Sequence, residues 1–143
     1  MKVQTQTHSS AAVVQSRRPA LVVPGLAAAV AAAVATSLVA AVGRAGGIDL
    51  EVPADSGESI PVLGFANLTF ILSVIGLAIA AGIRRWNGRP ARTFLRVALA
   101  LTAVSLVPPF LFGAGAATAC ALVVAHLVAA AIVIPVLVTR LPD

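Results

Sequence analysis

The residue with the clearest chemical potential in this sequence is His126, which interrupts the apolar run AHLVAAAIVIP at residues 125–135. Counted from Ala116 at about 1.5 Å per residue, His126 lies roughly 15 Å into a bilayer core about 30 Å thick. An ionisable side chain near the membrane midplane either fixes helix packing through a hydrogen bond or serves a functional site. His126 is therefore the first candidate for a catalytic or binding residue.

Two hypotheses for His126 remain open. In the structural hypothesis, a neutral ring bonds to a Ser or Thr hydroxyl or to a carbonyl freed by a proline, and so locks the helix register. In the functional hypothesis, the ring lines a cavity and binds a ligand or relays protons. A proton relay usually has a carboxylate nearby, and no apolar segment of this chain contains Asp or Glu. That absence favours the structural hypothesis.

Other polar side chains are predicted to lie near the depth of His126. By the same count, Ser73 and Thr102 fall about 16 Å from the outer boundary of their own segments. Asn67 and Ser105 lie nearer that boundary. Three helices can thus bring polar groups together around one level of the membrane. The binding-pocket candidates are Asn67, Ser73, Thr102, Ser105 and His126.

The sequence offers no second catalytic signature. It contains no nucleophile elbow, no paired carboxylates within the apolar segments, no cluster with metal-ligand spacing and no glycine loop for a phosphate. We therefore predict no metal and no cofactor, and an enzyme is less favoured than a protein without catalytic activity. His126 would be the acid or base of any reaction, with the hydroxyls as orienting donors.

Composition identifies the elements that must position these residues. The chain has 143 residues, is 59% hydrophobic and only 10% charged, and its mean hydropathy is +1.02. Several apolar runs approach or exceed the ~20 residues that cross a bilayer core. The sequence predicts an all-α integral membrane four-helix bundle formed by residues 20–141. Its spans are expected at about residues 21–43, 62–83, 93–113 and 116–139.

The basic residues predict how these spans are oriented. Of ten Lys and Arg residues, only Arg44 would lie on the outer side of a four-span protein. The positive-inside rule therefore places both termini in the cytoplasm, which an even number of spans also requires. The excess positive charge then sets the topology and contacts anionic lipid. A nucleic-acid site would need aromatic residues among the basic ones, and the segment between the second and third spans has only Trp86. The nine residues predicted on the cytoplasmic side are Lys2, Arg17, Arg18, Arg84, Arg85, Arg89, Arg92, Arg96 and Arg140.

The segment before the first span is predicted to be a disordered cytoplasmic leader, because residues 1–19 are rich in Gln, Ser and Thr and show no apolar periodicity. Basic residues followed by an apolar run could instead be a cleaved signal peptide, with residues 33–35 as the cleavage site. The apolar run is longer than the usual core of a signal peptide. A retained helix is therefore favoured.

Helix packing is suggested by a stripe of small residues in the first span. The stripe repeats every four residues and would let two helices approach closely in lipid, where water does not drive them together. Its partner could be another span of this chain or a second copy. The stripe consists of Gly25, Ala29, Ala33, Ser37 and Ala41.

Prolines predict two irregular spans. Pro108 and Pro109 should kink the third span and free the carbonyls of Val104 and Ser105, because proline donates no backbone hydrogen bond. Pro135 should do the same in the fourth span.

The short outer loop between the first two spans, RAGGIDLEVPADSGESIP at residues 44–61, holds four of the five acidic residues. Alternating apolar residues before Pro53 predict a short strand-like stretch. The acidic spacing matches no calcium loop. A solvated loop is favoured over a weak cation site or a lid on the mouth of the bundle.

The segments RTFLRVALALTAVSLVPPF and HLVAAAIVIPVL, with the acidic outer loop, resemble an uncharacterised family of small four-span membrane proteins from high-GC Gram-positive bacteria, domain of unknown function 6069. The resemblance covers roughly residues 20–141 and implies a membrane protein of the cell envelope with no assigned activity.

Three functions follow from these observations. The favoured one is a small accessory or structural component of the cell envelope in the bacterial cytoplasmic membrane, which contacts membrane lipids and pairs with itself or with a membrane-protein partner. The alternatives are a small transporter and a membrane-embedded enzyme that acts on a lipid or isoprenoid through His126. Small multidrug exporters, which the length suggests, depend on a glutamate in the first span that this chain lacks.

Overall fold

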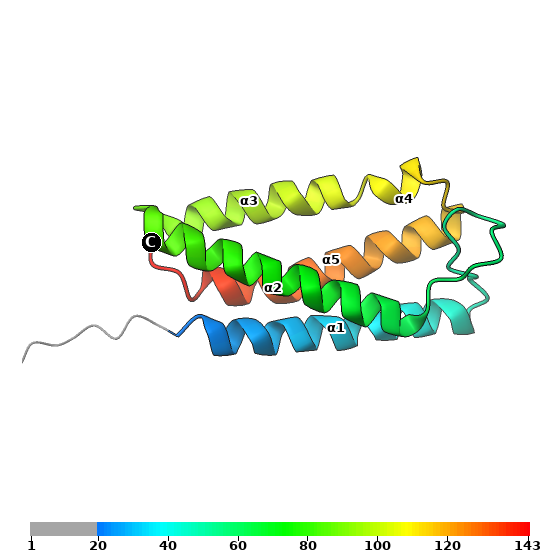
Figure 1. Cartoon of the computed structure of the whole chain (residues 1–143), viewed down its shortest axis with the longest axis horizontal. Coiled ribbons are helices and arrows are strands. Elements are labelled where there is room, and N and C mark those ends of the chain that lie inside the picture. Colours follow the sequence, from blue (N-terminus) through cyan, green and yellow to red (C-terminus); the bar gives the residue numbers. More distant parts are fainter. Residues whose placement is uncertain (1–19) are drawn as a thin grey trace, which may run out of the picture.

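The fold was obtained as a computed structural model that describes residues 20–143 (Figure 1). The predicted leader at residues 1–19 lies outside the described residues. The described chain forms five helices: α1 (Val22–Ala45), α2 (Val62–Trp86), α3 (Pro90–Ser105), α4 (Pro108–Leu111) and α5 (Ala116–Val138). Four segments are long and apolar enough to cross a membrane, with α3 and α4 together forming the third. The predicted all-helical membrane architecture is thus confirmed.

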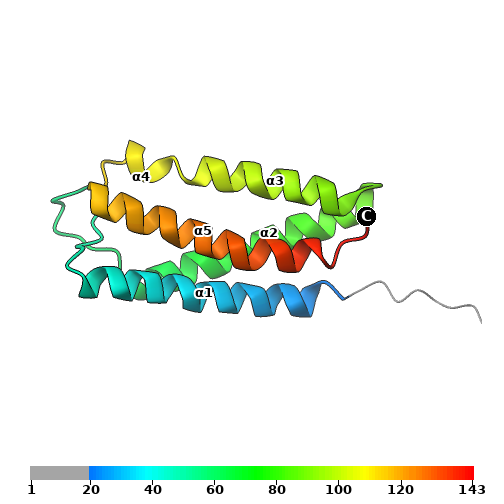
Figure 2. The ribbon, with the colours of Figure 1, turned by 180° about the vertical axis from the view of Figure 1, so that it is seen from behind.

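The helices run alternately up and down, so the connections gather at two ends (Figures 1 and 2). The start of α1, the short α2–α3 turn and the C-terminus lie at one end, which we call the arginine-rich end. Residues 46–61 and the α4–α5 connection lie at the other, the loop end. Within residues 20–143, six arginines lie near the arginine-rich end and one at the loop end: Arg84, Arg85, Arg89, Arg92, Arg96 and Arg140 against Arg44.

α1 packs against α2 and α5 of the same chain, and this contact is made by small residues. Gly25, Ala29 and Ala33 of the predicted stripe are buried, whereas Ser37 is half-buried and Ala41 is exposed. The full buried face of α1 is Gly25, Ala28, Ala29, Ala32, Ala33, Thr36 and Ala40. An α-helix has 3.6 residues per turn, so residues spaced four apart do not stay on one face of it. After one or two turns, the residue just before each member of the stripe therefore makes the contact. The expected packing partner is therefore found within the chain.

Pro108 and Pro109 divide the third span into α3 and α4. The break is made with tighter turns, since the Val107 N–H donates to the Val104 carbonyl at 3.2 Å. The prediction that the Val104 carbonyl would be free is therefore wrong, because the residue before the prolines still has an N–H to offer. A short 3₁₀-type turn satisfies that carbonyl where an α-helical turn would not.

Pro135 behaves differently, because α5 continues through it to Val138. The helix resumes its bonding directly afterwards, with the Thr139 N–H donating to the Pro135 carbonyl at 3.0 Å. Close to a helix end, the loss of one backbone donor is tolerated more easily than in the middle of a span.

The two ends of the outer loop pack onto the helices, while residues 53–59 between them are exposed. Leu50 is fully buried and belongs to an apolar cluster at the loop end, together with Ala40, Phe65, Ala121 and Ala125. The predicted strand-like stretch is reduced to one isolated antiparallel bridge between Glu51 and Ser59. Apolar side chains of the loop therefore cover the loop end of the bundle.

Two further contacts fasten this loop. The Arg44 guanidinium donates to the Ser59 hydroxyl at 2.6 Å and to the Ile60 carbonyl at 3.2 Å. The Ala54 N–H donates to the Gly113 carbonyl at 2.8 Å, which joins the loop to the α4–α5 connection. The single arginine of the loop end thus has a structural role in holding the loop.

Candidate functional site

A cavity of about 500 Å³ lies between α2, α3 and α5. α1 packs closely against both α2 and α5, whereas α2 and α5 contact each other little and α3 contacts both less extensively. Figures 1 and 2 show α2 and α3 diverging from their shared turn toward the loop end. Aliphatic side chains line most of the cavity, and several of them are exposed on the outer surface, including Leu68, Leu72 and Leu101. The cavity therefore opens sideways, on a surface that faces lipid in a membrane.

The polar lining comes from all three helices and carries no formal charge when His126 is neutral. It consists of Thr69, Ser73, Thr102, Ser105 and His126. Four of these five were candidates from the sequence: Ser73, Thr102, Ser105 and His126. The fifth candidate, Asn67, is exposed on α2 and is not among the lining residues.

His126 is half-buried on α5, and its ring is oriented by its own helix. Its Nδ1 lies 2.7 Å from the carbonyl oxygen of Leu122, one turn earlier. A carbonyl oxygen can only accept, so Nδ1 carries the hydrogen and Nε2 of the neutral ring is an acceptor. Within residues 20–143, Nε2 has no hydrogen-bond partner. Every fully buried side-chain nitrogen or oxygen in that range does have a partner, so Nε2 is not fully buried. Nε2 is therefore accessible.

Ser73 is the most deeply placed hydroxyl of the cavity, with its side chain only 8% exposed. Serine within a helix commonly donates to a carbonyl of the preceding turn, but Ser73 makes no hydrogen bond to any described residue. Because no buried polar side-chain atom of the described chain lacks a partner, its Oγ must be reachable from the cavity. Ser73 thus offers a donor and an acceptor to a ligand.

The other hydroxyls are partly committed to the protein. Ser105 donates to the Thr102 carbonyl at 2.7 Å, where the break of the third span removes the usual backbone donor. Thr69 bonds at 3.0 Å to Thr36, which is buried on α1. Thr102 makes no side-chain hydrogen bond within the described chain. Ser73, Thr102 and His126 are therefore the residues with polar atoms available to a ligand.

Thr69 was missing from the residues selected by sequence. The signal that could have found it is its spacing, since Thr69 and Ser73 are four residues apart and share one face of α2. The sequence analysis selected Asn67 by its polarity instead, and Asn67 lies on a different face of the helix.

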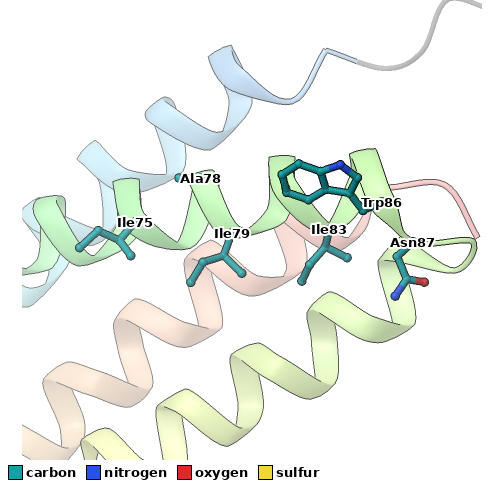
Figure 3. A pocket seen from close by; sticks show the side chains of 7 residues that line it. Ile75, Ala78, Ile79, Ile83, Trp86 and Asn87 are labelled. Atoms are coloured by element: carbon teal, nitrogen blue, oxygen red, sulfur yellow. The ribbon is translucent and has the colours of Figure 1, made fainter.

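A second depression, of about 590 Å³, follows α2 near the arginine-rich end (Figure 3). A single segment, residues 75–87, lines it, and the Trp86 ring folds back along the helix toward Gly82. Its polar groups are the indole of Trp86 and the amide of Asn87, both exposed. A tryptophan at the end of a span is typical of the membrane interface, so this depression is the weaker candidate for a specific site.

The family is decided by a comparison with family models. The model described as a family of unknown function, DUF6069, matches residues 16–143. The chain belongs to this family. Neither the comparison with curated proteins nor the comparison with solved structures gave a significant match. DUF6069 membership confirms the resemblance deduced from the sequence and adds no activity.

The chemistry open to this DUF6069 protein follows from its available atoms. Within residues 20–143, no group of three or more His, Cys, Asp or Glu side chains could hold a metal ion. The cavity offers an imidazole acceptor, two uncommitted hydroxyls and a large aliphatic surface. Such a site is suited to a molecule with long apolar chains and one small polar group.

Proposed function

We propose that this DUF6069 protein is an accessory component of the cell envelope that binds a membrane lipid in the cavity between α2, α3 and α5. The supporting observation is the combination of a sideways opening with unpaired polar atoms on Ser73 and His126. A lipid chain can enter between α2 and α3 directly from the bilayer. The aliphatic lining would then replace contacts with neighbouring lipids, while the polar atoms select the orientation.

Binding is favoured over transport and catalysis by the character of the site. Transport coupled to protons usually relies on a carboxylate beside the relaying residue, and a reaction would require a second reactive residue beside His126. The lining residues supply a single imidazole and neutral hydroxyls. The small residues on the buried face of α1 pack against α2 and α5 of the same chain. Because that face is already covered, we favour a lipid over a protein as the binding partner of this accessory protein.

The proposal is tested by filling the cavity. A Cβ at Gly76 would have no atom within 4 Å, so Gly76→Phe can place a ring in the cavity without displacing the backbone. Native mass spectrometry of protein extracted gently from its own membrane should show lipid bound to the wild type. We expect the lipid-bound fraction to fall about tenfold or more in Gly76→Phe, corresponding to a loss of at least ~1.4 kcal/mol of binding free energy.

The matched control is Ala81→Phe, which adds the same ring at an exposed position of α2. Ala81 lines neither the cavity nor the second depression. The control variant should retain lipid at the wild-type level. A wild type without bound lipid, or equal retention by all three proteins, would contradict the proposal.

We further propose that the arginine-rich end faces the cytoplasm of a bacterial cell and that α1 is retained as a membrane span. The asymmetry of arginines favours this orientation, and the packing of α1 against α2 and α5 favours its retention. In a Cys120→Ser background, Ser56→Cys should react with an impermeant maleimide in intact cells. Asn87→Cys, exposed in the α2–α3 turn, should react only after the membrane is permeabilised. The reverse pattern would overturn the orientation.

A further inference from the structure

We infer that the lipid in this cavity is uncharged and carries a hydroxyl group, which donates to Nε2 of His126. This inference rests on the proposed lipid-binding function and specifies the chemical class of the ligand. It follows from three features: the tautomer of His126, the free hydroxyl of Ser73 and the charge of the lining.

The tautomer decides which group His126 can recognise. Because Nδ1 donates to the Leu122 carbonyl, the neutral ring presents only an acceptor at Nε2. Ester and phosphodiester oxygens are acceptors as well and cannot bond to it. A ligand hydroxyl can, because it donates one hydrogen bond and accepts others.

Ser73 complements this acceptor from the opposite helix. Ser73 lies eleven residues from the start of α2 at the loop end, and His126 lies ten residues from the start of α5 at the same end. At ~1.5 Å per residue, the two positions are about 16 Å and 15 Å along their helices, and so share one level. A ligand hydroxyl between them could donate to His126 and accept from Ser73, leaving no polar atom of the three unpaired.

The lining argues against an anionic headgroup. No arginine or lysine is among the residues that line the cavity, and the described basic residues lie near the two ends of the bundle. A phosphate at the level of His126 would be buried without a cation, at a cost far larger than one hydrogen bond can return. Diacylglycerols and long-chain prenols share the required chemistry, since each combines apolar chains with a neutral hydroxyl.

The test uses three photoactivatable lipids: a diacylglycerol and a phosphatidic acid with identical acyl chains, and a prenol with an isoprenoid chain. The full chain is reconstituted into phosphatidylcholine vesicles that contain a trace of a diazirine-bearing diacylglycerol, phosphatidic acid or prenol, and the labelled peptides are mapped. We expect diacylglycerol or prenol, or both, to label the lining segments of α2, α3 and α5 more than phosphatidic acid does. The relative labelling by the two neutral probes identifies the source of the hydroxyl.

The residue assignments are tested with variants in the same vesicles. His126→Phe keeps a ring but removes the acceptor, and should lower neutral-lipid labelling roughly three- to tenfold, the effect of one hydrogen bond. His126→Gln, which restores a polar side chain of similar reach, should recover part of it. Ser73→Ala should also lower labelling, whereas Ser37→Ala, whose hydroxyl donates to its own helix outside the cavity, should not.

The outcomes separate the inference from the proposed function. Equal labelling of the cavity by phosphatidic acid and diacylglycerol would overturn the inference and leave lipid binding intact. Labelling that His126→Phe and Ser73→Ala leave unchanged would also overturn it. A cavity labelled by none of the probes would overturn both.

Discussion

Leu50→Ala is expected to lower the free energy of unfolding by about 2–5 kcal/mol, the usual range for truncating a fully buried leucine. Leu50 has an exposed fraction of 0% and packs with Ala40, Phe65, Ala121 and Ala125 at the loop end. Its backbone φ of 54° lies in the left-handed region, which a non-glycine residue adopts only at some cost. The buried side chain therefore holds the loop in a conformation that alanine would stabilise far less.

The midpoint and free energy of unfolding are measured in mixed micelles for Leu50→Ala and for a control variant, Leu63→Ala. Leu63→Ala is the same chemical change near the same end of the bundle, but the side chain of Leu63 is 74% exposed. Removing it should change stability by less than about 0.5 kcal/mol, as for most exposed positions. Equal losses for the two variants would mean that the outer loop is not packed onto the helices.

Gly25→Leu is expected to destabilise the bundle by about 1–3 kcal/mol or more, through overpacking. A Cβ at Gly25 would lie 2.6 Å from Cδ1 of Leu77 and 3.1 Å from Cδ2 of Leu137, and leucine adds three carbons beyond it. α1 would have to move away from both α2 and α5. In lipid, helix association depends on such close packing because apolar side chains are equally well solvated by lipid tails.

The matched control is Gly76→Leu, in which the same residue is introduced into a helix at a position with no atom within 4 Å of the added Cβ. That variant should be as stable as the wild type or slightly more so, because leucine favours the helix by up to about 1 kcal/mol over glycine. Thermal unfolding in the same detergent compares the two. Similar stabilities for Gly25→Leu and Gly76→Leu would show that α1 does not pack against Leu77 and Leu137.

The spans could be predicted from sequence because the length of an apolar run determines whether it crosses a membrane. Their ends could be predicted only within a few residues. The third helix begins at Pro90 instead of residue 93, because proline fits the first turn of a helix, where its missing N–H is not needed. The second helix continues to Trp86 beyond the expected end at residue 83, because arginine and tryptophan at the interface are compatible with helix.

The candidate site was harder to predict, because sequence gives depth along a helix but not rotation about its axis. Ser73 and Asn67 were both selected as polar residues of one span, yet only Ser73 lines the cavity. Rotation is determined by packing, and α2 is turned by its contact with the small residues of α1. The cavity itself depends on the divergence of α2 and α3, which no local pattern in either helix encodes.

The central claim, that the cavity between α2, α3 and α5 holds a lipid, is tested most directly by cryo-electron microscopy of the protein in a lipid nanodisc with a rigid antibody fragment bound. The account predicts continuous elongated density that enters between α2 and α3 and ends beside His126 and Ser73. A map with α3 closed against α2 and the His126 ring packed among aliphatic side chains would contradict it.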